Sequence, residues 1–282
     1  MNHAIELRGV RKEYADFVLG PVDLTLPGGT VLGLIGENGA GKTTLLKTML
    51  GVVRPDGGEI RLLGREAAQA KADIGAVFED CFFYEGLRAK DVSAVLRRVY
   101  PTWDEELFRR CLQKYAIAGE KKIKALSRGM RMKLSLAAAL AHRPRLLLLD
   151  EATAGLDPVA REEILDELLD FVADEAHTLV LSSHITSDLE RVADYIAYLH
   201  RGKLLLLEEK DRLLETYGKV ICGAGDLEGV EPALLIGARS SAFSATALVR
   251  DRAEFVRRYP KIHVERVSLE DIMVHLNRRE TE

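Results

Sequence analysis

The stretch GENGAGKTT, residues 36–44, constrains the fold of this chain more than any other part of the sequence. It matches the pattern G-x-x-x-x-G-K-[ST] in full, with the apolar run TVLGLIG before it and the helix-like run KTTLLKTMLG after it. Glycines let a loop between a strand and a helix curl, so that successive backbone N–H groups point inward and bind phosphate oxygens. The alternative is a glycine-rich turn that only caps the helix. The complete match in this context favours the phosphate-binding loop.

The residue types of this loop each have a chemical reason. The ammonium of Lys42 is expected among the β- and γ-phosphate oxygens of a nucleotide, and the Thr43 hydroxyl supplies an oxygen to Mg²⁺. The helix that begins here directs the positive end of its dipole at the same charge. The predicted nucleotide-binding residues of the loop are Gly36, Glu37, Asn38, Gly39, Ala40, Gly41, Lys42, Thr43 and Thr44.

A second motif, the acidic stretch LLLLDEATAGLD, follows about a hundred residues later. Asp150 ends an apolar strand and is expected to hold Mg²⁺, and Glu151 follows it directly. A carboxylate at that point can orient and polarise a water molecule for attack on the γ-phosphate. The same letters could mark only an acidic turn or helix start. The strand, however, stands in the chain order that a phosphate-loop fold requires, which favours the catalytic interpretation.

Composition limits the class of protein. The chain has 282 residues, 47% of them hydrophobic and 30% charged, which fits a soluble globular protein with one large domain and a small one. A formal net charge of −4 argues against a general nucleic-acid binder, and no nucleic-acid partner is expected. Cys81, Cys111 and Cys222 lie far apart, so they predict no metal site and no disulfide framework, and a reducing cytosol fits them best.

Apolar segments are all shorter than the roughly 20 residues that a membrane helix needs. The first residues, MNHAIELRG, show no apolar core of a secretion signal. We therefore expect a cytoplasmic protein. If it works at a membrane, another polypeptide must cross that membrane.

Strand-like and helix-like segments alternate along the chain, which favours an α/β fold with a mostly parallel sheet covered by helices. Two alternating runs near the start, AIELRGVRKEY and VDLTLPGG, predict half-buried strands of an antiparallel part. Residues of about 84–140 read as a helical insertion, in which Thr102 and Glu105 have the spacing of a helix capping box. Short strands and helices after residue 208 predict a small α+β appendage. The expected domains are therefore 1–207 and 208–282.

The motifs, taken in order, resemble those of the ATP-binding cassette (ABC) ATPases: residues 36–44, then LSRGM, LLLLDE, AGLD and SSH. The resemblance runs from about residue 4 to residue 207. In that family the signature motif, usually L-S-G-G-Q, binds the γ-phosphate held by a second subunit. Ser127, Gly129 and Met130 correspond to signature residues here, whereas the stretch KALSRGMRMKLSL alone would indicate only an ordinary helix N-cap. Arg128 and Met130 depart from the usual signature.

The resemblance implies further roles. Tyr14 corresponds to the aromatic residue that stacks on adenine, although a half-buried strand tyrosine is the alternative. Asp157 corresponds to a residue that meets the facing subunit, and His184 to a histidine that contacts the γ-phosphate. Glu79 stands where the family usually has a glutamine that binds Mg²⁺. The implied catalytic residues are Glu151, His184 and Lys42, and the implied metal ligands are Thr43, Glu79 and Asp150.

The partners implied are ATP, Mg²⁺, a second copy of the chain in a head-to-tail dimer, and a separately encoded polytopic permease. Further likeness to subunits paired with ABC-2-type permeases, the bacitracin-export-like group, implies a bacterial exporter subunit on the inner face of the cell membrane. One alternative is a soluble ABC ATPase that acts as a regulatory factor or on ribosomes or DNA. Another is an ATP-gated module without hydrolysis, against which Glu151 argues. The aromatic run CFFYEGL, residues 81–87, is predicted either to receive a permease helix or to pack in the core.

Overall fold

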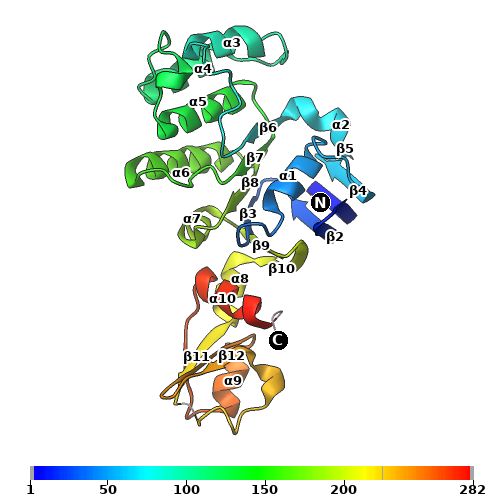
Figure 1. The fold of residues 1–282 in the computed structure, drawn as a ribbon, viewed down its shortest axis with the longest axis vertical. Coiled ribbons are helices and arrows are strands. Elements are labelled where there is room, and N and C mark those ends of the chain that lie inside the picture. The colour runs from blue at the N-terminus through cyan, green and yellow to red at the C-terminus, as the bar shows by residue number, and fades with distance from the viewer. Residues whose placement is uncertain (1–2, 224, 280–282) are drawn as a thin grey trace.

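Three β-sheets organise residues 3–223 and 225–279, the part of the chain that the computed structural model describes. The first two sheets share the upper half of the molecule with a group of helices, and the third lies at the C-terminal end (Figure 1). No helix within these residues is long and apolar enough to cross a bilayer.

The N-terminal sheet is antiparallel, as the alternating sequence predicts. Its strand order is β2-β1-β4-β5, and β1 pairs with both β2 and β4. Apolar side chains of one face, among them Ile5 and Leu7, are fully buried. The strands are β1 (His3–Tyr14), β2 (Phe17–Pro27), β4 (Gly57–Leu62) and β5 (Arg65–Glu66).

The central sheet has the strand order β10-β9-β3-β8-β7-β6, in which only the β9–β10 pair is antiparallel. Strands β3, β7 and β8 are buried along their whole length, which explains their apolar sequences. Since parallel strands place their carboxyl ends at one edge, the polar residues that end them meet there. The strands are β3 (Val31–Ile35), β6 (Ile74–Val77), β7 (Leu146–Asp150), β8 (Thr178–Ser183), β9 (Tyr195–His200) and β10 (Lys203–Glu209).

Helices cover both faces of the central sheet, and each face contributes to a separate apolar cluster. The helix that follows the phosphate-binding loop packs with the N-terminal sheet, and the helices that follow β7 and β8 pack on the other face. These helices are α1 (Lys42–Met49), α6 (Pro158–Val172) and α7 (Thr186–Val192), and a short α2 (Ala67–Ala70) follows β5.

The helical insertion has its own apolar cluster, which includes Phe108, Ile123 and Leu134. Its helices are α3 (Ala89–Leu96), α4 (Glu105–Lys114) and α5 (Arg128–Ala141).

The predicted capping box of α4 is wrong. Asp104 is the N-cap, and its side chain accepts a hydrogen bond of 2.8 Å from the Leu107 N–H. The Thr102 hydroxyl donates instead to the carbonyl of His142, because this turn packs on the end of α5.

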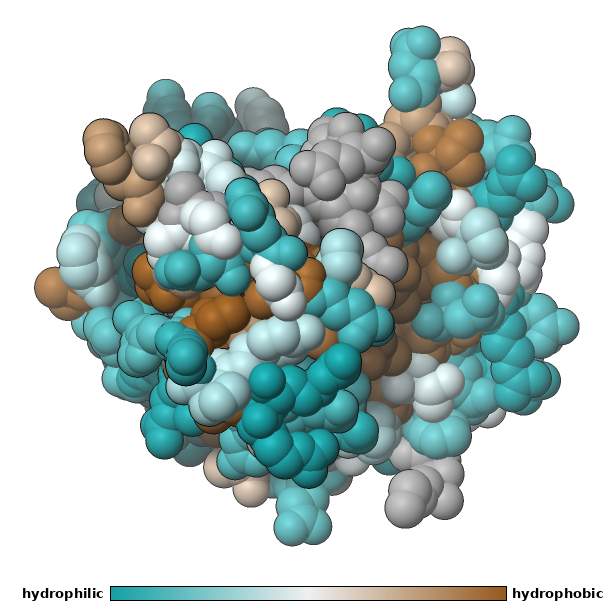
Figure 2. All heavy atoms as spheres, turned by 90° about the horizontal axis from the view of Figure 1, so that it is seen from below, coloured by the Kyte–Doolittle hydropathy of each residue, from teal (hydrophilic) through white to brown (hydrophobic). Residues whose placement is uncertain are grey.

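The C-terminal sheet has the order β12-β13-β11-β14 and lies among the last helices of the chain. The final helix returns to the central part: Leu269 N donates to Glu190 Oε1 at 2.7 Å, and Tyr198 Oη donates to Asn277 Oδ1. Figure 2 shows this end of the molecule, where hydrophobic patches lie among hydrophilic residues. The elements are α8 (Lys210–Thr216), β11 (Gly218–Cys222), β12 (Ile236–Ser240), β13 (Ala245–Val249), α9 (Arg252–Arg258), β14 (His263–Glu265) and α10 (Leu269–Arg279).

Candidate functional site

The glycine-rich loop joins the end of β3 to the start of α1. A Cβ at Gly36 would lie 2.4 Å from the carbonyl oxygen of Leu199, and Gly41 has φ of +107°, so both positions require glycine. The buried Lys42 ammonium donates to the carbonyls of Gly36 and Glu37, at 2.7 and 3.3 Å. The loop therefore curls around its own lysine, as a phosphate cradle requires.

Asp150 lies beside this cradle at the end of β7. Its Oδ2 accepts a hydrogen bond of 2.6 Å from the Thr43 hydroxyl, and its Oδ1 accepts one of 2.5 Å from the Ser182 hydroxyl at the end of β8. Thr43 and Asp150, two predicted metal ligands, thus present hard oxygen atoms side by side. This donor set fits Mg²⁺, which takes few protein ligands and fills its octahedron with water and phosphate oxygens.

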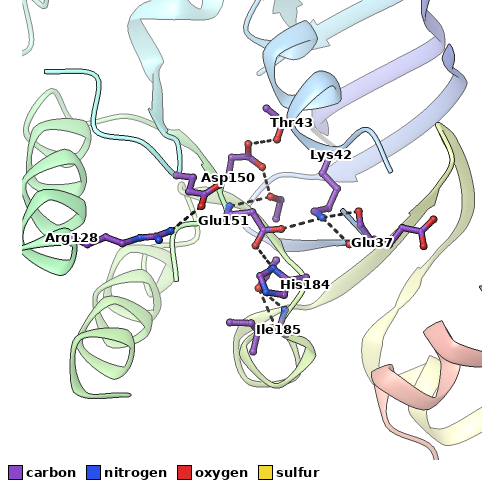
Figure 3. Close-up of polar contacts among 12 residues, drawn as sticks. Glu37, Lys42, Thr43, Arg128, Asp150, Glu151, His184 and Ile185 are labelled. Atoms are coloured by element: carbon purple, nitrogen blue, oxygen red, sulfur yellow. Dashed lines mark hydrogen bonds and ion pairs between the residues drawn. The ribbon is translucent and has the colours of Figure 1, made fainter. Parts of the chain in front are cut away.

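Glu151 joins Lys42 and His184 into one cluster (Figure 3). Its Oε1 lies 3.1 Å from Lys42 Nζ, and its Oε2 lies 2.7 Å from His184 Nδ1. The Glu151 backbone has φ of +51°, a strained conformation for a side chain of this size. Such strain persists only where the surroundings enforce it, often at functional sites. The structure therefore brings the three predicted catalytic residues together.

Ser127 and Asp157 cap helices within this chain. Ser127 Oγ accepts from Met130 N at 3.2 Å at the start of α5, and Asp157 Oδ1 accepts from the Val159 and Ala160 N–H groups at the start of α6. Neither these residues nor Gly129 line the open cavity of about 240 Å³ beside the glycine-rich loop. The part that the signature residues play in nucleotide binding stays a prediction.

Glu79 does line that cavity, together with Lys42, Thr43 and Glu151. It follows β6, which is parallel to β7 and ends at the same carboxyl edge of the sheet. Its carboxylate accepts a hydrogen bond of 2.9 Å from Arg128 Nη2 at the start of α5. Both residues are departures from the family pattern, but nothing in the sequence pairs them.

Tyr14 lies outside the cavity, at the end of β1, and is 46% exposed. The ammonium of Lys12 lies 5.6 Å from the centre of its ring. Phe17, the first residue of β2, lines the cavity instead, and its ring centre is 6.5 Å from that of Tyr14. Sequence reasoning missed Phe17, although an aromatic residue three positions after Tyr14 was a visible signal.

Ser182 is a second residue that sequence reasoning did not single out. It is fully buried and binds Asp150, while its backbone carbonyl accepts from Glu151 N at 3.1 Å. The signal was the pair of serines that ends the apolar strand next to the acidic one. Ser182 therefore orients both members of the acidic pair.

The aromatic run after Glu79 divides between surface and core. Phe82 and Tyr84 are 72% and 76% exposed. Phe83 packs against the apolar cluster of the helical insertion. Core packing, one of the two interpretations given from sequence, therefore applies to Phe83, and a permease contact stays a prediction for Phe82 and Tyr84.

A curled glycine loop with an inward lysine, and a Thr–Asp oxygen pair beside it at the end of parallel strands, define a nucleotide-binding protein of the P-loop class. Comparison with known proteins narrows the class. Residues 19–154 match the family described as ABC transporter.

Curated relatives agree with this match. The chain is 35% identical to the ABC transporter ATP-binding protein YtrB of Bacillus subtilis, over 77% of this chain and 75% of that protein. It is 34% identical to the lantibiotic transport ATP-binding protein SrtF of Streptococcus pyogenes, over 73% and 91%. It is 32% identical to the bacitracin transport ATP-binding protein BcrA of Enterococcus faecalis, over 73% and 69%. The chain belongs to the ABC transporter ATP-binding proteins, as the order of its motifs indicated.

A solved structure described as the ATP-binding subunit of an ABC transporter has a TM-score of 0.67 and 25% identity, over 75% of this chain and 92% of that one. The structure of cbiO1 from Clostridium perfringens has a TM-score of 0.63 at 23% identity, over 74% and 89%, and supports the fold alone. The predicted fold class, an ABC-type α/β core, is confirmed. The chain is therefore an ATP-binding subunit of an ABC transporter.

Proposed function

We propose that this chain hydrolyses Mg–ATP and couples the reaction to a separate membrane permease. The observation that carries the proposal is the cluster of Lys42, Glu151 and His184 next to the Thr43–Asp150 oxygen pair. All five side chains come from the carboxyl ends of strands β7 and β8 or from the start of α1 after β3, so one rigid sheet positions them.

Each residue has a distinct task in this proposal. Lys42 and the loop N–H groups bind the β- and γ-phosphates. Thr43 and Asp150 would hold Mg²⁺, and Glu79, which follows β6, would complete the set of ligands. When bound there, Mg²⁺ would supply positive charge that offsets the charge developing on the phosphate oxygens. Glu151 accepts a proton from the attacking water, and the hydrogen bond from His184 fixes its Oε2.

Two copies of the chain are expected to close head to tail with C2 symmetry. Ser127 and Gly129 of each copy then face the nucleotide held by the other. The N-terminus of α5 adds its unpaired N–H groups and dipole at the same point. Support comes from the position of these residues outside their own nucleotide cavity.

The proposals of a permease partner and of export are inferred from the similar proteins. Proteins named for bacitracin and lantibiotic transport match over about three quarters of this chain, and a Nod factor export ATP-binding protein is 35% identical over 80% of it. We therefore propose an exporter subunit that lies on the cytoplasmic face of the membrane through its permease. Tyr84 and Phe82, exposed beside Glu79, are the proposed contacts.

Assays of ATP binding and phosphate release with the purified chain test the enzymatic part of the proposal. The chain should bind ATP and release phosphate in the presence of Mg²⁺, and Lys42→Ala should abolish or sharply weaken ATP binding. Near-normal affinity in the Lys42→Ala variant would contradict the assignment. Affinity purification from membranes then tests the partner: recovery of a polytopic membrane protein supports the transporter, and recovery of ribosomes or DNA instead would contradict it.

A further inference from the structure

The Glu79–Arg128 ion pair joins two positions at which this chain departs from the usual family residues. Glu79 Oε1 and Arg128 Nη2 are 2.9 Å apart, although the residues are separated by 49 positions in the chain. Figure 3 shows the Arg128 side chain extending from α5 toward the acidic residues of the site. The pair therefore connects the helical insertion to the carboxyl edge of the central sheet.

The Arg128 side chain also packs on the loop that follows Glu151. A Cβ placed on Gly155 would lie 2.8 Å from Arg128 Nη1 and 3.0 Å from its Cζ. Gly155 has φ of +66°, so glycine is favoured there by its backbone as well as by the guanidinium. Arg128 thus contacts Glu79, which lines the nucleotide cavity, and lies against the loop that follows Glu151, while Ser127 and Gly129 beside it do not line that cavity.

The charges around the cavity give this contact an electrostatic effect. Three carboxylates, those of Glu37, Glu79 and Glu151, line the cavity, and Asp150 lies next to Thr43 at its edge. Lys42 is the one cation among the side chains described as lining that cavity. An unpaired Glu79 would add repulsion toward the phosphates of ATP in the absence of metal. The guanidinium of Arg128 compensates that charge, yet about half of each side chain is exposed, so the pair is weak enough to open.

We propose that Arg128 is a positioning residue for Glu79: it holds the carboxylate at the rim of the nucleotide cavity and competes with Mg²⁺ for it. The proposal rests on the Mg–ATP function proposed above. Arg128 lowers the repulsion that metal-free ATP meets, and Mg²⁺ must displace Arg128 to gain the Glu79 oxygen. The two departures from the family pattern then act as one unit.

Nucleotide binding without turnover tests this directly. Affinity for a fluorescent ATP analogue is measured in EDTA and over a Mg²⁺ titration. In Arg128→Ala, binding in EDTA should weaken about two- to fivefold, the range for an exposed ion pair. The Mg²⁺ concentration for half-maximal binding should fall by a similar factor, because the competing cation is gone. Arg128→Lys keeps the charge and should stay close to the wild type in EDTA.

Glu79→Gln tests whether Arg128 acts through its ion pair with Glu79 or only through the structure of the helix. This variant should need more Mg²⁺ than the wild type, and adding Arg128→Ala to it should change neither the EDTA affinity nor the Mg²⁺ requirement further. Arg131→Ala is the matched control. Arg131 lies in the same helix as Arg128, and both line a surface groove that also contains Glu79. Among the described residues, however, Arg131 forms no ion pair with Glu79. If the alanine variant folds poorly, Arg128→Gln replaces it, because glutamine removes the charge but retains more of the side chain.

The outcomes distinguish the two proposals. A wild-type chain that fails to bind ATP, or binds it without regard to Mg²⁺, would overturn the proposed function. A wild type that depends on Mg²⁺, with Arg128→Ala having no effect or the same effect in the presence and absence of Glu79→Gln, would overturn the role of Arg128 alone. An effect of Arg131→Ala equal to that of Arg128→Ala would do the same.

Discussion

Lys42 Nζ lies 3.1 Å from Glu151 Oε1, and both side chains are largely buried. The pair lets a carboxylate remain in a closed site, because each charge offsets the cost of burying the other. Glu151 Oε1 accepts no hydrogen bond in the described structure, so the attraction to Lys42 is electrostatic alone. Phosphate oxygens that draw Lys42 toward themselves would leave Glu151 held by His184 and open to a water molecule.

Glu151→Gln should keep ATP binding and lose most hydrolysis. The amide preserves size and can still contact His184, but it cannot accept a proton. Phosphate release should fall by roughly 10²- to 10⁴-fold, the range for a positioned acid–base group. ATP affinity, measured by titration with the fluorescent analogue, should change little because Lys42 and the loop remain.

The same variant should accumulate an ATP-bound dimer, visible by size-exclusion chromatography with light scattering. Glu59→Gln, on an exposed position of β4, is the control for loss of one carboxylate. Unchanged turnover in Glu151→Gln would show that another group orients the water.

Gly129→Ala tests the proposed contact between two copies. A Cβ at Gly129 would lie 3.4 Å from Ala160 Cβ and 3.9 Å from Leu156 Cδ2, so a single chain accommodates it with little adjustment. In the dimer, the methyl group would stand where the backbone approaches the facing nucleotide. ATP affinity of the single chain should stay normal, whereas turnover should fall at least tenfold.

Mixing two impaired variants sharpens that prediction. A dimer of Lys42→Ala with Gly129→Ala contains one site that carries both defects and one intact site. The turnover of the mixture should therefore exceed that of either variant alone. Activity that stays at the level of the separate variants would argue that each chain works by itself.

Most of the fold could be predicted from local sequence patterns. Strands β3, β7 and β8 are apolar throughout because both of their faces are buried, so their position in a central parallel sheet could be predicted. Once that sheet was assigned, Lys42, Asp150 and His184 had to meet, because carboxyl ends of parallel strands share an edge. The strand β14, only three residues long, gave no pattern to detect.

Contacts between segments that lie far apart in the chain could not be predicted from the sequence. Glu79 and Arg128 looked like two unrelated substitutions, since nothing local shows that a turn after β6 faces the start of α5. The capping box failed for a similar reason, because the packing of Thr102 on His142 is a tertiary contact and leaves Asp104 to cap α4.

Tyr84→Ser should uncouple transport without affecting the isolated subunit. Tyr84 is 76% exposed, so its loss should leave the free energy of unfolding nearly unchanged. ATPase activity of the purified chain should persist, whereas transport by the complete complex should fall. Phe83→Ser is the contrasting variant: Phe83 packs in the helical insertion, and its loss should cost about 1 kcal/mol of stability or more. Normal transport by Tyr84→Ser would exclude it from the permease contact.

His142 predicts a pH dependence of stability that is independent of catalysis. Its ring is 2% exposed at the end of α5, stacks on Tyr100 at 4.1 Å, and has Nε2 3.2 Å from the carbonyl oxygen of Ile74. Burial lowers the pKa of His142 below its ordinary value of 6.5, although the carbonyls of Ile74 and Ala138 and the charge of Asp73 favour the protonated form. The folded protein therefore binds this proton less readily than the unfolded chain.

The sign of the effect follows from that difference in pKa. Above about pH 6.5 the imidazole is neutral in both states, and its contribution to the free energy of unfolding is complete. As the pH falls from there toward the lower folded pKa, only the unfolded chain gains the proton, so stability decreases by at most about 1.4 kcal/mol per pH unit. His142→Gln retains a side-chain N–H donor without a titrating group, and urea unfolding from pH 7.5 to 5.5 should show a shallower loss than in the wild type. His263→Gln, at an exposed position of β14, controls for the removal of one imidazole. Equal slopes in wild type and His142→Gln would mean that other groups govern the acid sensitivity of the fold.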